Sequence, residues 1–276
     1  MTVVVPDRLR RISRPWRYMI IALVVVLVMT VAESITGTSN LTSKGTSGAA
    51  LRLAIPILLA GLGGLYSERA GVVNIGLEGM MIGGTWFSGW GAWQYGPWRG
   101  LALGIFGGLL FGLIHALATV TFNVDHIVSG VAINILGLGA MRFLSSIVYT
   151  PDTGGSVIQS PAVPGIGNVS LPVLAGGSFF GNGTPDLLGD LEAKSWFLVS
   201  DVSGILRGFT GDLNWLTLVG VALVPLTAWL LWRTAWGLRL RSCGEDPWAA
   251  ESLGVGVRSM KYFGVMISGA LAGFGG

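Results

Sequence analysis

Four polar side chains in one glycine-rich stretch are the strongest candidates for chemistry in this chain. Residues 67–81 read SERAGVVNIGLEGMM and place Glu68, Arg69, Asn74 and Glu78 beside long apolar runs. Asn74 and Glu78 are four residues apart, so a continuous helix would present them on one face. An ionisable group at membrane depth is costly and normally faces a bundle interior or a water-filled cavity. We predict that Asn74 and Glu78 line a solute pathway and that Glu68 and Arg69 are interfacial charges.

The same stretch is poorly suited to a continuous helix because it is rich in glycine. The glycines are Gly71, Gly76, Gly79, Gly83 and Gly84. Irregular backbone at membrane depth is tolerated where it lines a cavity, and interrupted helices are a common way to build transport sites. We therefore predict one interrupted membrane helix in this part of the chain.

A second polar patch surrounds Asn123, Asp125 and His126. Asp125 is predicted to cap a helix, and the histidine spacing matches no HExxH-type metal motif. Asn134 lies within the following apolar run, where an amide seeks an interior partner, and it is a third candidate for the pathway. The sequence contains neither a GxxxxGK[ST] phosphate loop nor a GxSxG elbow. We expect no catalytic residue, no metal site and no cofactor.

The elements that position these residues are predicted to be membrane helices. The chain has 276 residues, of which 51% are apolar and only 11% are charged, and its mean hydropathy is +0.68. Soluble proteins carry about 25% charged residues, so this composition cannot cover a water-exposed surface. The basic residues cluster beside apolar runs, which favours membrane orientation over nucleic-acid binding. We predict an all-α, polytopic transmembrane helix bundle.

Apolar segments of the length that a membrane span requires, about 20 residues, recur along the chain. We expect about seven: Tyr18–Ala32, Leu51–Tyr66, Val72–Trp93, Trp98–Phe122, Ile127–Tyr149, Leu213–Trp232 and Lys261–Gly276. Glycines spaced by four residues, at 79/83, 104/108/112 and 269/273, let helices approach closely. We predict that these glycines pack helices tightly within one bundle rather than form a dedicated dimer face.

Charge clusters orient the predicted bundle. Five arginines before the first apolar segment place residues 1–17 in the cytoplasm as an N-terminal tail, followed by a membrane domain over 18–276. Counting spans then places the acidic, loop-like segment 151–212 outside and the basic segment 233–260 inside. The basic residues of the latter region are Arg233, Arg239, Arg241, Arg258 and Lys261. Within the outer segment, residues 195–209 fit either an interfacial amphipathic helix or a plain loop.

Residues 236–257, which lie largely within the cytoplasmic segment, are predicted to contain a short helix. Asp246 is a suitable cap, Pro247 suits the first helical position, and residues 248–253 fill one or two turns before Gly254. A short helix held along the membrane surface by two spans is a docking surface for a soluble partner. We expect a partner protein there.

Two segments resemble the permease subunits of ATP-binding-cassette importers that serve branched-chain amino acids, ribose and other simple sugars, and nucleosides. Residues 67–81 are similar to the nucleoside and simple-sugar branch, where an Asn-Ile-Gly-Leu-Glu-Gly string follows the second span. Residues 233–276 resemble the loop and following helix of that branch, including the strings GLRLR, GEDP and SGALAG. The resemblance covers most of residues 50–276.

The resemblance implies a coupling loop that seats in a groove of a cytoplasmic ATPase subunit. Its residues would be Gly244, Glu245, Ala249, Ala250 and Gly254. It further implies a second permease subunit, an extracytoplasmic solute-binding protein, and a multi-pass location in the plasma membrane among its lipids. The chain would then be no enzyme but a transport subunit for a nucleoside or simple sugar.

Two features depart from the family pattern, and three alternatives stay open. The chain stops within an apolar run, which predicts that further C-terminal helices are missing, and the segment near 175–212 is longer than usual. One alternative is a permease for branched-chain amino acids. Another is an ion-coupled secondary carrier with Glu78 as its proton or sodium site. The third is a membrane enzyme with an active site in residues 151–212.

Overall fold

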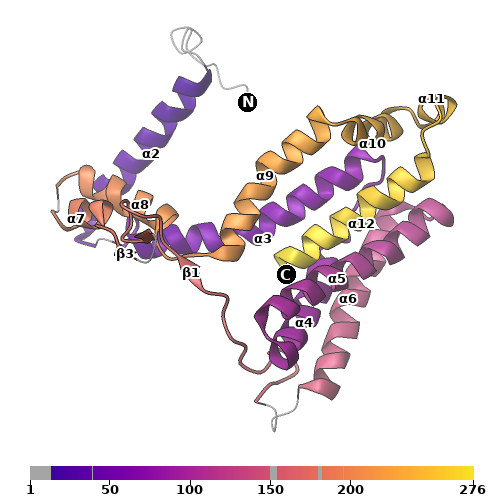
Figure 1. Cartoon of the computed structure of the whole chain (residues 1–276), viewed down its shortest axis with the longest axis horizontal. Coiled ribbons are helices and arrows are strands. Elements are labelled where there is room, and N and C mark those ends of the chain that lie inside the picture. Colours follow the sequence, from indigo (N-terminus) through magenta and orange to yellow (C-terminus); the bar gives the residue numbers. More distant parts are fainter. Residues whose placement is uncertain (1–13, 39, 150–153, 180–181, 195) are drawn as a thin grey trace. The chain divides into compact units, whose positions relative to one another are not determined.

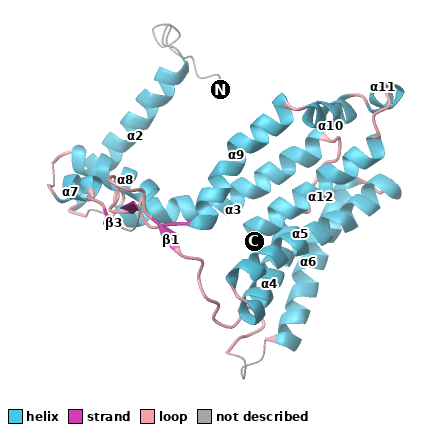
Figure 2. Cartoon of the chain, in the orientation of Figure 1, coloured by secondary structure: helices cyan, strands magenta, loops and turns pink. Residues whose placement is uncertain are grey.

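Figures 1 and 2 show the computed structural model of the chain, which describes residues 14–38, 40–149, 154–179, 182–194 and 196–276. Most of the described residues are helical, as the all-α prediction requires. The chain divides into two compact units, one of Met1–Arg52 with Asn168–Asn214 and one of Leu53–Gly167 with Trp215–Gly276. Arg8, Arg10 and Arg11 of the predicted cytoplasmic tail lie outside the described residues.

The elements follow the chain in a simple order. The helices are α2 (Arg14–Thr36), α3 (Lys44–Arg69), α4 (Leu77–Tyr95), α5 (Pro97–Ala116) with its π-helical extension η1 (Leu117–Thr121), α6 (His126–Val148), α7 (Leu187–Ala193), α8 (Val199–Thr210), α9 (Trp215–Arg233), α10 (Ala235–Glu245), α11 (Pro247–Ser252) and α12 (Val257–Gly275). Four two-residue strands, β1 (Asn168–Val169), β2 (Ser178–Phe179), β3 (Asn182–Gly183) and β4 (Leu213–Asn214), form the antiparallel pairs β1–β4 and β2–β3.

Within the described residues, five helices are long and apolar enough to cross a membrane: α2, α3, α5 with η1, α6 and α9. The chain is therefore a multi-pass membrane protein. Helices α4 and α12 occupy the other two of the seven predicted segments, and each is 19 residues long. Both are long enough to span, but neither reaches the mean hydropathy of the other five helices.

Glycines bring α4, α5 and α12 into close contact in the second unit. A Cβ atom added to Gly91 of α4 would lie 3.1 Å from the Cα of Gly100 in α5, and one added to Gly112 of α5 would lie 3.1 Å from the Cα of Gly269 in α12. Gly104 of α5 faces Gly273 of α12 in the same antiparallel register. The prediction of tight helix packing within one bundle is confirmed.

Helices α3 and α9 run in the same direction within the second unit (Figure 1). Gly220 of α9 faces Ile55 of α3, where an added Cβ would approach the isoleucine side chain to 2.8 Å. Further along both helices, Tyr66 Oη donates a hydrogen bond to Thr227 Oγ1 at 3.3 Å. Their ends meet where Leu240 of α10 packs in a buried cluster with Tyr66 and other apolar side chains.

Helix α8 settles the question left open at residues 195–209, because residues from Val199 to Thr210 form a helix rather than a loop. Its small residues Gly204 and Gly208 face Thr42 and Ser47 in the first unit, which lets the backbones approach. Its opposite face is apolar and exposed, at Val199, Leu206 and Phe209 among others. The helix is therefore amphipathic, with its small, partly polar face turned to the protein.

Charged side chains hold α7, α8 and the start of α3 together in the first unit. Arg207 of α8 forms ion pairs with Asp186 and with Glu192, the latter at 2.8 Å. Lys44, the first residue of α3, pairs with Asp212. The hydrogen bonds to Glu192 and Asp186 raise the pKa of Arg207, so the guanidinium stays charged.

Candidate functional site

The short helix predicted in residues 236–257 is present as α11. The carboxylate of Asp246 accepts a hydrogen bond from the backbone N–H of Ala249 at 3.0 Å, and Pro247 occupies the first turn, where its missing N–H costs nothing. Beyond the helix, Gly254 has φ of +81°, a conformation that glycine adopts without strain. The cap, the proline and the terminating glycine are all confirmed.

Large apolar side chains are exposed on α11 and on the residue that follows it. Trp248 and Leu253 are 82% and 83% exposed, respectively. Glu245, Ala249 and Gly254 are also exposed, whereas Ala250 is buried and anchors the helix. Large, exposed, rigid apolar side chains on a short ordered helix are typical of protein-docking sites. Three of the five predicted coupling residues are thus exposed, whereas Gly244 is half-buried and Ala250 is buried.

Gly244 has a different position from the rest of that predicted set. A Cβ on Gly244 would lie 2.5 Å from the carbonyl oxygen of Arg69 and 2.9 Å from the amide nitrogen of Gly71. Gly71 has φ of +80°, so glycine is needed on both sides of this contact. Helix α10 therefore rests directly on the backbone that follows α3.

The segment predicted over Val72–Trp93 is not broken within its helix, because α4 runs without a break from Leu77 to Tyr95. The irregular backbone precedes it, at residues 70–76 between the end of α3 and the start of α4, and we call this stretch the interruption. Non-helical backbone leaves N–H and C=O groups that must find partners when they are buried. Near the start, the Ser67 hydroxyl donates to the carbonyl of Val72 at 2.9 Å. The next residue, Val73, donates its N–H to His126 Nδ1 at 3.3 Å. His126 therefore accepts at Nδ1 and supplies a partner for this non-helical backbone.

Asn74 lies at the centre of the interruption and is only 5% exposed. Its carbonyl oxygen accepts from the N–H of Gly76 at 3.0 Å, which stabilises the turn into α4. Its amide nitrogen donates to the hydroxyl of Ser268 in α12 at 2.9 Å. Asn74 thus joins the interrupted segment to α12.

Asn134 of α6 also forms hydrogen bonds with the interruption and with the start of α4. Its carbonyl oxygen accepts from the N–H of Gly79 at 2.8 Å, and its amide nitrogen donates to the carbonyl of Ile75 at 3.0 Å. The first N–H groups of a helix have no partner within the helix, so a side chain from α6 caps α4. Asn134 fixes the geometry of the turn in addition to any contact with a solute.

One geometric expectation for this region is wrong. Asn74 and Glu78 do not share a helical face, because α4 begins only at Leu77 and Asn74 lies in the irregular segment. The structure buries Asn74 and exposes Glu78, and it gives Glu78 no hydrogen bond or ion pair to any described residue. Glu68 is exposed, and Arg69 lies 5.8 Å over the ring of Trp232.

The candidate coupling loop and the interrupted segment are therefore physically connected. On one side of α11, Gly244 of α10 contacts Gly71; on the other side, Ser268 of α12 bonds Asn74. Burial raises the pKa of the Cys243 thiol beside this contact, so the thiol stays neutral. Any displacement of α10–α12 acts directly on residues 70–76.

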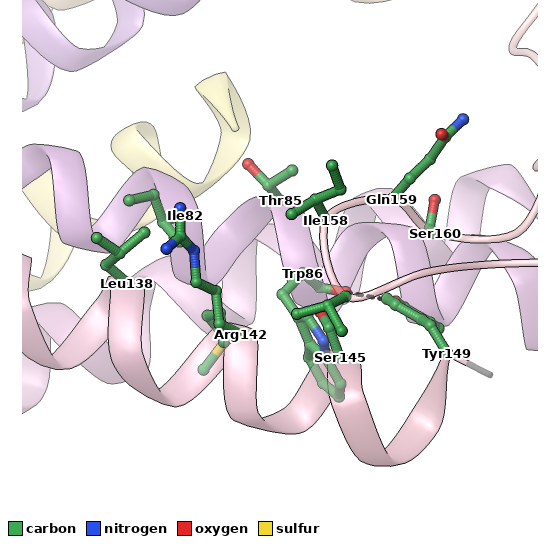
Figure 3. A pocket seen from close by; sticks show the side chains of 12 residues that line it. Ile82, Thr85, Trp86, Leu138, Arg142, Ser145, Tyr149, Ile158, Gln159 and Ser160 are labelled. Carbon is green, nitrogen blue, oxygen red and sulfur yellow. Dashed lines mark hydrogen bonds between the residues drawn. The ribbon is translucent and has the colours of Figure 1, made fainter.

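A cavity of about 300 Å³ lies between α4, α6 and residues 157–160 (Figure 3). Its wall includes Trp86 of α4 and Tyr149 after α6, whose ring centroids are 6.0 Å apart. The Tyr149 hydroxyl donates a hydrogen bond to the carbonyl of Trp86 at 3.4 Å. Arg142 and Gln159 add polar groups.

Sequence reasoning missed this cavity and the residues that line it. The signal available was the tryptophan-rich pattern of residues 86–93, which gives no indication that a loop 70 residues later would face it. In the described part of the chain, no cluster of three His, Cys, Asp or Glu side chains could hold a metal ion.

The mostly helical, multi-pass architecture defines an integral membrane protein. Comparison of the sequence identifies its family. Residues 45–276 match the family described as the permease component of the branched-chain amino acid transport system, and the chain belongs to that family.

Relatives with assigned names narrow the comparison. The chain is 37% identical over 238 residues to the guanosine ABC transporter permease protein NupQ of Bacillus subtilis, covering 83% of this chain and 64% of the relative. It is 33% identical to the nucleoside ABC transporter permease protein NupC of Lactococcus lactis (80% and 62%) and to the putative glucose ABC transporter permease protein TsgC13 of Haloferax volcanii (85% and 62%). The chain thus spans less than two thirds of the length of these curated relatives. No solved structure matches it.

Proposed function

We propose that the chain is part of the membrane-spanning permease subunit of an ATP-binding-cassette importer. The observation that carries the proposal is the exposed apolar helix α11, held between α10 and α12 in a chain of this permease family. A separate cytoplasmic ATPase subunit docks on residues 244–254 and hydrolyses ATP. A second permease subunit and an extracytoplasmic solute-binding protein complete the importer.

The coupling mechanism follows from the contacts around the interruption. ATP-driven movement of the ATPase subunits displaces α11, and Gly244 and Ser268 transmit the displacement to residues 70–76. Asn74, Glu78 and Asn134 are the side chains at this segment that face or frame the pathway. The buried Asn74 and the half-buried Asn134 hold the turn, and the exposed Glu78 is available to the solute or to water.

Seven membrane segments, rather than five, fit the direction of the helices best. The parallel packing of α3 and α9 calls for an odd number of crossings between them, which supports a crossing by α4 in addition to those by α5 and α6. Gly83 of α4 lies against Phe111, well along α5, as expected of a helix that traverses beside its neighbour. With residues 1–17 in the cytoplasm, segment 151–212 is then outside and 233–260 is cytoplasmic in the plasma membrane.

A nucleoside is the solute class that the comparisons favour, because two relatives carry nucleoside names at 33–37% identity. A simple sugar is the second candidate, supported by the 33% identity to the putative glucose permease. Branched-chain amino acids have weaker support, in the family description and in a 90-residue match to a probable branched-chain amino acid permease of Methanocaldococcus jannaschii. Family membership disfavours an ion-coupled carrier or a membrane enzyme.

Labelling of single cysteines tests the topology. In the full-length protein with Cys243→Ala, Gln94→Cys should react with an impermeant maleimide only from outside intact cells. Ser252→Cys should react only in inverted vesicles. Both positions are exposed. Labelling of Gln94→Cys from the cytoplasmic side would show that α4 does not cross.

Co-purification tests the docking surface. The full-length protein should retain its ATPase subunit, and Trp248→Glu should release it because a charge replaces the central apolar side chain. Trp98→Glu is the matched control, since Trp98 is 61% exposed at the start of α5 on the proposed outer side. Retention of the ATPase by Trp248→Glu, or its equal loss in both variants, would contradict docking on α11.

A further inference from the structure

We propose that the cavity between α4, α6 and residues 157–160 binds the base of a purine nucleoside that presents an oxo group and a ring nitrogen as neighbouring acceptors. The inference rests on the proposed nucleoside transport and adds a site and a preference among bases. All the residues that line the cavity belong to the second unit.

The cavity has the size and composition of a small-molecule site. Its volume of about 300 Å³ is at the lower end of the range that ligand pockets occupy, roughly 300–1,000 Å³. Most of its lining is apolar, from residues such as Ile82, Leu138 and Met141, with a few polar groups among them. This combination favours a compact ligand with one apolar face and few polar contacts.

An aromatic wall supplies the surface against which a planar base stacks. Trp86 lines the cavity, and Trp90 supports it from the same helix face at 6.3 Å with nearly parallel rings. Tyr149 lies across from Trp86, and Trp93 meets Tyr149 edge-on at 6.3 Å. Aromatic side chains held in place by neighbouring rings form rigid platforms, and any base can stack on an open face of such a platform.

Arg142 supplies the specificity. It projects from the last turns of α6 into the cavity lining (Figure 3) and forms no hydrogen bond or ion pair with any described residue. A cation within a membrane helix is costly unless it has a partner or water, so an acceptor-rich ligand would offset that cost. The guanidinium fork matches the O6 and N7 acceptors of guanine, whereas adenine presents a donor in place of O6.

Residues 157–160 bring further polar groups to the same cavity. Gln159 and Ser160 line it and come from the segment that follows α6, which places them at the proposed outer side. Gln159 is exposed, so its amide is free to reorient toward a ribose hydroxyl or a base edge. A nucleoside arriving from outside would meet this rim first.

Direct photolabelling of the purified full-length protein in nanodiscs tests the inference without the ATPase. With 8-azidoguanosine as the probe, we expect saturable labelling of peptides from α4, α6 or residues 154–160, competed by guanosine better than by adenosine. Arg142→Gln should weaken competition by guanosine at least about fivefold and leave that by adenosine nearly unchanged. Arg99→Gln is the matched control, since Arg99 is an exposed arginine outside the cavity.

The outcomes separate this inference from the proposed function. Labelling that is absent, not saturable, confined to other helices, or insensitive to Arg142→Gln would overturn the base site. ATP-dependent nucleoside uptake by the full importer could persist in each of those cases and would then stand without this cavity. Gln159→Ala gives a second variant at an exposed position, and we expect a smaller loss of guanosine competition than for Arg142→Gln.

Discussion

The two compact units solve the packing problem with different chemistry. In the bundle of α4, α5 and α12, the contacts are made by glycines such as Gly104, Gly108 and Gly269, which bring backbones together. In the other unit, glycines of α8 also approach their neighbours, but charged side chains add ion pairs, with Arg207 between Asp186 and Glu192. All the ion pairs found among the described residues lie in the first unit, which consists of Met1–Arg52 and Asn168–Asn214.

The difference indicates the solvent that each region meets. Lipid offers no hydrophobic gain for one apolar helix leaving it for another, so membrane helices associate through close packing of small residues and through hydrogen bonds. An ion pair has a small desolvation cost where water can solvate the charges that remain exposed. Four substitutions test this contrast, in order of decreasing expected effect on stability.

Replacing Gly108 by leucine should disrupt the bundle. An added Cβ would lie 2.5 Å from the Cα of Gly273, and backbone cannot move aside as a flexible side chain can. We expect a loss of about 3 kcal/mol or more in unfolding free energy, measured by thermal unfolding in detergent. Gly61→Leu is the control, because no atom lies within 4 Å of an added Cβ there. Equal stability of the two variants would refute packing through glycine.

Replacing Asn134 by alanine should destabilise the interruption by about 2 kcal/mol, because the N–H of Gly79 and the carbonyl of Ile75 each lose a partner. Hydrogen exchange should increase at residues 75–79 more than elsewhere. Ser146→Ala serves as the comparison, since that exposed hydroxyl bonds only within its own helix. Unchanged exchange at residues 75–79 would mean that Asn134 does not hold the turn.

Replacing Arg207 by methionine should loosen the outer region and leave the glycine-packed bundle intact. The side chain is 27% exposed, so solvent screens the two ion pairs and we expect a loss of about 1 kcal/mol. Limited proteolysis should cut residues 186–210 faster, with no change within α4–α6. Faster cleavage in both regions would show that the two units are not separately stabilised.

The Lys44–Asp212 pair should make the smallest contribution, because Asp212 is largely exposed. The hydrogen bond from Lys44 lowers the pKa of Asp212. The stabilisation is therefore present above the ordinary pKa of aspartate, about 3.9, and is lost as the pH falls through the lower folded value. Thermal unfolding at pH 7 and pH 3 should show a slightly smaller pH effect for Asp212→Asn, and a larger pH effect in the variant would contradict the pair.

Features that depend on neighbouring residues were predicted better from the sequence than features that depend on contacts between distant residues. The cap at Asp246, the turn at Gly254 and the glycine spacings each follow from neighbouring residues, and the structure contains them. The hydrogen bonds from Asn134 to Ile75 and Gly79 join residues more than 50 positions apart, so no local pattern indicated them.

The cavity illustrates the same limit. Its aromatic wall and its polar rim come from helices and a loop that meet only after the bundle has formed. The expected shared face of Asn74 and Glu78 failed for a related reason. Helix periodicity applies only within a helix, and the glycines that signalled an interruption also removed the basis for that periodicity.

Uptake by reconstituted importer tests the central claim most directly. Proteoliposomes would contain the full-length permease with its ATPase and second permease subunit, with the binding protein supplied outside and radiolabelled guanosine as the solute. We predict uptake that requires ATP hydrolysis and that Trp248→Glu abolishes while Trp98→Glu leaves it intact. Uptake driven by an ion gradient without ATP, or ATP-driven uptake unaffected by Trp248→Glu, would contradict it.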